Sequence, residues 1–157
     1  MHPNELLITR FYEAFKRGDY KIMQACYAND AIFNDPVFKN LNSEQVKGMW
    51  EMFCVKSKDL KITYSNITAN EQQGSAEWRA EYSFSKKENK VINSITAHFL
   101  FKDGKIINHS DSFNFYKWAR QALGLQGLLL GWTRMLKNKV SEGGLKRLND
   151  YILSTRH

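Results

Sequence analysis

The chain has 157 residues, of which 43% are hydrophobic, 13% aromatic and 25% charged. This profile predicts one globular domain with a sizeable core and excludes a disordered chain. The N-terminus shows no signal-peptide pattern and no apolar run is long enough to span a membrane, so we expect a cytoplasmic protein. Cys26 and Cys54 have no CxxC or Cys/His spacing, and no nucleotide-binding or zinc motif is present, so no disulfide, metal or cofactor is expected.

The formal net charge of +7 is concentrated at the C-terminal end. From Lys117 onward there are eight lysines and arginines against two acids, whereas the first 116 residues are close to neutral. Such a segment can meet nucleic acid or an anionic membrane surface, but a solvated helix face is the commoner explanation. Aromatic and basic residues are not interleaved as in RNA-binding proteins, so nucleic acid is not expected as a partner.

The first third of the chain has helical periodicity. Apolar residues recur at helical spacing over residues 4–16, and Gly18-Asp19 ends this predicted helix. A short helix is expected over about residues 20–27, and a third from residue 43 to about residue 53.

The pattern then changes to the period of two that is typical of strands. Strands are predicted over residues 60–68, 77–84, 94–101 and 107–115, with the Asp103-Gly104 pair as a hairpin turn. Helices followed by an antiparallel meander predict an α+β domain with helices against one face of a curved sheet. The remaining residues, 118–156, predict a kinked apolar helix and then a basic amphipathic one.

Two polar residues interrupt the apolar face of the last predicted strand. The alternation places His109 and Asp111 on the same face as Ile107, Phe113 and Phe115. A buried imidazole and carboxylate need partners, since an unsatisfied one costs roughly 1–3 kcal/mol. The partner can be another side chain, which makes the pair structural, or a substrate, which makes it part of a site.

A third acid, Asp35, precedes Pro36 at the end of the segment Tyr27–Val37. The proline holds Asp35 in extended backbone, and a rigid acid beside an apolar interior can have its pKa shifted toward proton chemistry. The alternative is an ordinary turn, which Asp-Pro pairs often begin.

Three segments resemble the nuclear transport factor-like superfamily, specifically its SnoaL-like and ketosteroid-isomerase-like members. They are Thr9–Asp19, Tyr27–Pro36 and Ala97–Ile106. The resemblance implies a cone: a curved antiparallel sheet with a mixed edge, three N-terminal helices over its concave face and an enclosed apolar pocket. It also implies a homodimer through the outer face of the sheet. Residues 1–116 would form the cone domain, and 117–157 a basic helical extension packed on it.

The resemblance also suggests roles for the acids. Asp35 falls where ketosteroid isomerases carry their general base, and Asp111 matches the acid on the last strand of SnoaL-like cyclases. The two hydrogen-bond donors of ketosteroid isomerases fall on Phe11 and Ala97, which cannot donate, with Tyr12 expected to point away. Ketosteroid isomerisation is therefore not expected.

These residues support one hypothesis and one alternative. The hypothesis is an apolar pocket that binds a small hydrophobic carbonyl or polycyclic molecule and catalyses cofactor-free proton transfer, as in an isomerase or cyclase, through Asp35, His109 and Asp111. The alternative is a non-catalytic ligand-binding or protein-interaction domain of the same fold. The expected pocket-lining residues are Phe11, Phe15, Phe33, Trp50, Trp78, Tyr82, Phe99 and Phe113.

Overall fold

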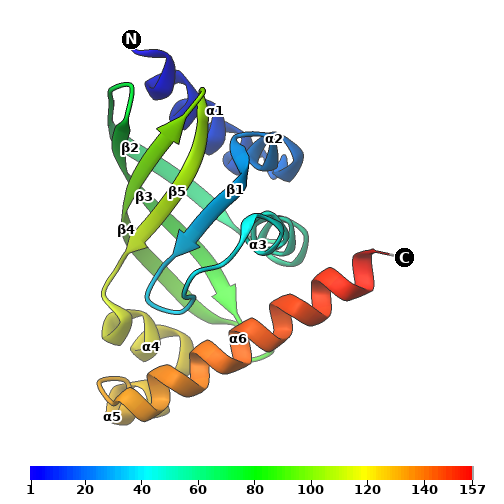
Figure 1. Cartoon of the computed structure of the whole chain (residues 1–157). Coiled ribbons are helices and arrows are strands. Elements are labelled where there is room, and N and C mark those ends of the chain that lie inside the picture. The colour runs from blue at the N-terminus through cyan, green and yellow to red at the C-terminus, as the bar shows by residue number, and fades with distance from the viewer. Residues whose placement is uncertain (157) are drawn as a thin grey trace.

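The computed structural model describes residues 1–156 and has the α+β architecture that the sequence predicts (Figure 1). Three helices and a strand come first, followed by the remaining strands and then three C-terminal helices. The elements are α1 (Pro3–Arg17), α2 (Tyr20–Ala25), β1 (Tyr27–Asn34), α3 (Ser43–Lys56), β2 (Lys61–Ala69), β3 (Gln73–Phe84), β4 (Asn89–Lys102), β5 (Lys105–Ser112), α4 (Phe115–Leu123), α5 (Leu125–Leu130) and α6 (Arg134–Thr155).

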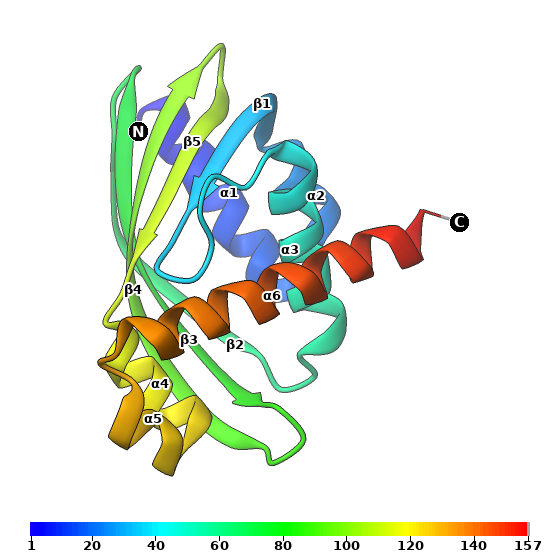
Figure 2. The same ribbon diagram turned by 60° about the horizontal axis from the view of Figure 1, so that its bottom comes forward.

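The five strands form one open, curved sheet in the order β1-β5-β4-β3-β2. The pair β1 and β5 is parallel and the other pairs are antiparallel, which makes the mixed edge that was expected. Helices α1, α2 and α3 lie against the concave face (Figures 1 and 2). Strand β4 alternates buried and exposed residues along its whole length, so one face of the sheet forms the core. The cone fold is therefore confirmed.

Strand β1 is the element that the sequence patterns did not identify. A helix was expected to reach Tyr27, but α2 ends at Ala25 and Tyr27 begins the strand. The strand buries Tyr27, Ala31 and Phe33, but Asn29, which a period of two would also turn inward, is exposed beside an irregularity in the pairing with β5. The long-range hydrogen bonds to β5, which local sequence does not reveal, decide its conformation.

Strand β5 contains a one-residue bulge that changes which residues face the core. Leu100 pairs with Asn108 and Phe101 with Ile106, so Ile107 is the additional residue. The prediction that Ile107 shares the inner face was therefore wrong, and Ile106 is buried instead. The strand also ends at Ser112 rather than at residue 115, because Asn114 caps α4 by accepting a hydrogen bond from the N–H of Lys117.

The C-terminal helices pack along the open end of the cone. Helix α4 lies against β4, and the Trp118 ring meets Phe84 edge-on. Helix α6 passes the loop after β1 and reaches α3 (Figure 2). Gly144 on α6 faces Phe38 in that loop, and Gly48 on α3 leaves room for Ile152. His157 lies outside the described residues.

We predict that Gly127 is required for the packing of α5 against α4. A Cβ at this buried position would overlap the backbone carbonyl group of Ala119, so Gly127→Ala should lower the free energy of unfolding by about 1–3 kcal/mol. Gly143 is the matched control, since nothing lies within 4 Å of a Cβ built there. Gly143→Ala should raise stability by up to about 1 kcal/mol through helix propensity. Urea denaturation measures both, and equal effects of the two substitutions would contradict the prediction.

Candidate functional site

A continuous chain of hydrogen bonds runs through the interior of the cone. The Tyr27 hydroxyl lies 2.7 Å from His109 Nδ1, and His109 Nε2 lies 2.9 Å from Asp111 Oδ1. Two indoles close the ends: Trp50 Nε1 donates to the Tyr27 hydroxyl at 2.8 Å, and Trp78 Nε1 donates to Asp111 Oδ1 at 3.3 Å. The side chain of His109 is fully buried and that of Asp111 is 3% exposed. We call these five residues the buried relay.

The hydrogen bonds of the relay are mutually compatible. In the His109 tautomer with hydrogen on Nε2, that nitrogen donates to Asp111 Oδ1 and Nδ1 accepts the hydrogen of the Tyr27 hydroxyl, whose oxygen accepts the Trp50 N–H. Every polar atom of the His109 ring is thereby satisfied by a neighbouring side chain, as a buried polar group requires.

Aromatic side chains from β4, β1, α1 and α3 surround the imidazole of His109. The ring centroids of Phe99 and Phe33 lie 4.4 Å and 5.0 Å from that of His109, and those of Phe11 and Trp50 lie 5.8 Å and 6.0 Å away. With both nitrogens bonded and both faces covered, the imidazole orients Asp111 and has no free nitrogen to offer a substrate.

Asp111 keeps one carboxylate oxygen available. Its Oδ1 accepts hydrogen bonds from His109 and Trp78, while Oδ2 has no hydrogen-bond partner within residues 1–156. The alternation of residues predicted that His109 and Asp111 face the core, and their burial on β5 confirms this. Two fixed donors on one oxygen hold the second oxygen in a defined direction.

Asp35 lies at the edge of the same interior, in the turn that follows β1. Its Oδ1 accepts from the backbone N–H groups of Val37 and Phe38 at 2.7 and 2.6 Å, so it does form the turn that its sequence favours. Its Oδ2 has no partner among the described residues. Burial, with a smaller contribution from the charge of Asp111, raises the pKa of Asp35 to about 6 against the lowering effect of the two N–H groups. Asp35 therefore both stabilises the turn and has a raised pKa.

Tyr12 was missed as a site residue. It was expected to point away from the pocket, yet it is fully buried, with its ring 6.0 Å from that of Trp78 and 6.5 Å from that of Phe99. Within the described chain its hydroxyl has no hydrogen-bond partner. Burial and the charge of Asp111 hold the pKa of Tyr12 well above its usual range, so the hydroxyl remains a donor. Its position in the apolar stripe of the first helix was the available signal.

Seven of the eight predicted pocket-lining residues, Tyr82 included, lie in the buried core, and Phe113 is the exception. Phe113 is only partly buried, because β5 ends before it. Tyr82 accepts a hydrogen bond from Trp118 Nε1 at 2.9 Å, which leaves its own hydrogen without an acceptor among residues 1–156, and burial together with the charge of Asp35 raises its pKa. The others lie together in the buried core: Phe11, Phe15, Phe33, Trp50, Trp78 and Phe99.

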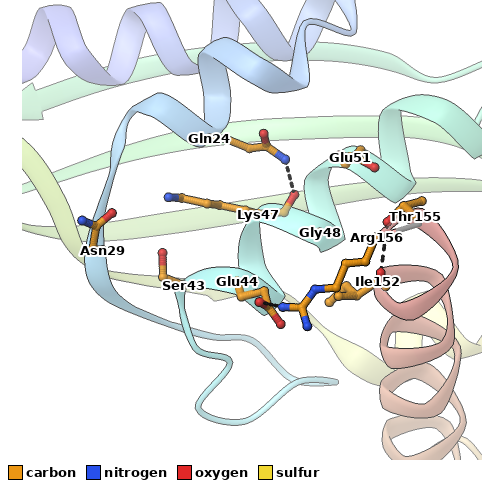
Figure 3. A pocket seen from close by; sticks show the side chains of 10 residues that line it. All are labelled: Gln24, Asn29, Ser43, Glu44, Lys47, Gly48, Glu51, Ile152, Thr155 and Arg156. Carbon is orange, nitrogen blue, oxygen red and sulfur yellow. Dashed lines mark hydrogen bonds and ion pairs between the residues drawn. The ribbon is translucent and has the colours of Figure 1, made fainter.

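Two surface clefts lie elsewhere, on the side where α2, β1 and α3 meet. One, of about 430 Å³, lies between α3 and the end of α6, where Arg156 forms an ion pair with Glu44 (Figure 3). The other, of about 530 Å³, is lined by Lys47, Lys102 and Lys105 among others. Neither cleft is lined by any of the three predicted catalytic residues.

Within residues 1–156, no cluster of histidine, cysteine, aspartate and glutamate side chains could hold a metal ion. None of the helices in this part of the chain has the length and apolar character needed to cross a membrane.

Comparison with known proteins agrees with the cone architecture. The sequence model of the SnoaL-like domain matches residues 8–109. A structure of a proposed polyketide cyclase from Xanthomonas campestris pv. campestris is 21% identical, with a TM-score of 0.64 over 76% of this chain and 96% of that one. An epoxide hydrolase of M. tuberculosis, described as LEH-like, is 15% identical, with a TM-score of 0.63 over 81% and 92%.

The proposed polyketide cyclase IdmH from Streptomyces antibioticus is 18% identical, with a TM-score of 0.63 over 79% of this chain and all of that one. Curated proteins give no match. At these identities the solved structures establish the fold, and the sequence model establishes the family over most of the chain. The chain therefore belongs to the SnoaL-like domain family, within the nuclear transport factor-like superfamily.

Proposed function

We propose that this domain binds a small apolar molecule that carries a carbonyl oxygen, in the interior of its cone, and catalyses cofactor-free proton transfer on it. The observation that carries the proposal is the buried hydroxyl of Tyr12, which has no hydrogen-bond partner within residues 1–156. Besides burial, the charge of the nearby Asp111 raises the pKa of this hydroxyl. A buried donor without an acceptor costs roughly 1–3 kcal/mol. An oxygen of a bound ligand would supply that acceptor.

The proton carrier in this proposal is Asp35. A general base works best when its pKa is near the working pH, and the pKa of about 6 meets this condition. Its free Oδ2 takes a proton from the carbon beside the carbonyl; the electron pair of that C–H bond forms the C=C bond of the enolate, and the π pair of the carbonyl moves onto its oxygen. In an isomerisation Asp35 then returns the proton to another carbon as the carbonyl re-forms; in a ring closure the enolate carbon bonds to a second carbonyl carbon of the ligand, and the proton goes to the oxygen of that second carbonyl.

The remaining polar groups hold the ligand and its developing charge. The hydroxyls of Tyr12 and Tyr82 each have a hydrogen to donate to the enolate oxygen, and such a donor is typically worth about 3–4 kcal/mol of barrier. Asp111, oriented by His109 and Trp78, offers Oδ2 to a hydroxyl of the ligand. The cyclase and epoxide-hydrolase descriptions of similar structures support small-molecule chemistry on this fold.

A second candidate is a binding domain without catalysis. It is favoured by the saturation of His109, whose two nitrogens and ring faces are all occupied by protein groups, as in a structural hydrogen-bond network. In this case the cone would bind an apolar ligand or a protein segment, and the only role of Asp35 would be to stabilise the turn that follows β1.

The proposal extends to assembly. A homodimer through the outer face of the sheet remains our prediction. That face carries the exposed residues of β4, including His98 and Leu100. The division into a cone of residues 1–116 and a basic extension of residues 117–157 is likewise proposed.

The catalytic proposal predicts proton exchange with solvent. Incubated in D₂O with a panel of bicyclic and tricyclic ketones, the protein should accelerate deuterium uptake at the carbon beside the carbonyl, followed by NMR. Asp35→Asn should slow this exchange at least about a hundredfold, since it removes the proton carrier. Asp30→Asn, an exposed acid on β1, is the control and should leave the rate unchanged. Ketone binding without exchange in the unmodified protein would favour the non-catalytic candidate.

The raised pKa of Asp35 predicts a pH dependence of stability. Because the pKa in the folded chain, about 6, lies above the ordinary value of 3.8, the folded state binds the proton more tightly than the unfolded state. The free energy of unfolding should therefore fall by roughly 2–3 kcal/mol as the pH rises from about 4 to about 6. Asp35→Asn should remove this fall in urea denaturation measured across the range.

Asp59 provides a control of opposite sign for this profile. Hydrogen bonds from the side chain and backbone of Ser83 lower its pKa, so its contribution is lost as the pH falls. Asp59→Asn should leave the decline due to Asp35 in place. A decline that persists in Asp35→Asn would show that another group causes it.

The two fully enclosed tyrosines should respond oppositely to the same substitution. Tyr12→Phe removes a hydroxyl without a partner, so stability should stay unchanged or rise by up to about 1 kcal/mol. Tyr27→Phe leaves Trp50 Nε1 and His109 Nδ1 unpaired and should cost about 2–3 kcal/mol. Thermal unfolding measures both. The proposal also requires that Tyr12→Phe weaken ketone binding, and unchanged affinity would count against a ligand contact at Tyr12.

A further inference from the structure

The C-terminal extension exposes a concentrated apolar surface. It covers α5, the turn after it and the start of α6, where Trp132 is 76%, Met135 72% and Leu125 69% exposed. Exposed apolar residues that occur singly need no explanation, but a cluster within eleven consecutive positions does. We call this cluster the α5 patch; it consists of Leu125, Leu128, Leu129, Leu130, Trp132 and Met135.

Only positive charges accompany the α5 patch in the chain. Between Asp111 and Glu142 the sequence contains no acid. Two of the cations lie beside aromatic rings at the base of the patch, with Arg120 5.7 Å from the ring centroid of Tyr116 and Lys137 5.7 Å from that of Phe115. The full set of basic residues in this segment is Lys117, Arg120, Arg134, Lys137 and Lys139.

The position of the patch leaves it accessible. Helices α4 and α5 form one end of the molecule, away from α1 and α2 (Figures 1 and 2). The indole of Trp132 donates to the backbone oxygen of Leu129, which holds an exposed aromatic ring against the turn. A tryptophan with a satisfied N–H beside leucines and cations is the composition found at membrane–water interfaces.

We propose that the α5 patch docks this protein on the surface of an anionic lipid bilayer. The leucines, Met135 and Trp132 would enter the headgroup boundary, and the surrounding lysines and arginines would meet the lipid charge. A second copy of the chain fits this surface poorly, because it would bring two sets of like charges together. Nucleic acid would use the charges but leave the apolar side chains exposed. The proposal is independent of the ligand chemistry in the cone.

The test is vesicle co-sedimentation at low salt. The protein should pellet with vesicles of phosphatidylcholine and phosphatidylglycerol in equal parts and remain in solution with phosphatidylcholine alone. Added salt should weaken the binding steeply. Intrinsic fluorescence gives a second readout, because Trp132 is exposed while Trp50, Trp78 and Trp118 are buried. Anionic vesicles should shift its emission to shorter wavelength, and Trp132→Phe should abolish that shift.

Matched variants distinguish binding through the α5 patch from nonspecific adsorption to vesicles. Leu129→Ser should weaken vesicle binding at least about tenfold, whereas Leu153→Ser, with nearly the same exposure at the far end of α6, should not. Replacing Arg134 and Lys139 by Gln should weaken it by about tenfold or more, whereas the same change at Lys58 and Lys61 should have little effect. Circular dichroism confirms that each variant is folded.

Three results would overturn the proposal. The first is a lack of binding to anionic vesicles at low salt. The second is equal binding by Leu129→Ser and the unmodified protein, which would mean that charge alone acts, as for a nucleic-acid partner. The third is a concentration-dependent dimer in sedimentation velocity that Leu129→Ser disrupts, since the patch would then join two copies of the chain.

Discussion

The burial of one carboxylate, that of Asp111, is the constraint on which the interior of this protein depends. A carboxyl group buried among aromatic rings needs hydrogen-bond partners, and here His109 and Trp78 provide them. His109 in turn needs Tyr27, and Tyr27 needs Trp50. The consequence is that β1, α3, β3 and β5 are joined at one point. Packing of the cone and orientation of the candidate site are therefore the same set of contacts.

The architecture was predictable where side-chain periodicity was strong. The alternation in β4 and the apolar stripe of α1 are local properties of the sequence, and they determined the helices-then-sheet order. Strand β1 and the bulge at Ile107 were not predictable in this way, because both depend on pairing between distant segments. Periodicity shows which face a residue occupies, but not which strand lies beside it.

The candidate site was predictable to the same extent. The inward direction of His109 and Asp111 followed from parity, but the partners of His109 did not, since Tyr27 is 82 residues away along the chain. Without those partners the imidazole resembles a free acid–base group, whereas with them it orients a neighbour. Tyr12 shows the reverse case: a residue that sequence reasoning set aside is the one whose hydroxyl lacks a partner within the described chain.

The bulge in β5 reverses the alternation of inward-facing and outward-facing side chains between the two ends of that strand. Ile106 and His109, three positions apart, both face inward, whereas strict alternation would send one of them to the outside. The hairpin end of the strand therefore contributes an aliphatic side chain to the core, while the other end contributes an imidazole and a carboxylate. Loss of Ile107 would restore strict alternation and leave Ile106, His109 and Asp111 on the inner face, whereas a one-residue slip of the strand beyond the bulge would turn Asn108, Ser110 and Ser112 inward in place of the imidazole and the carboxylate.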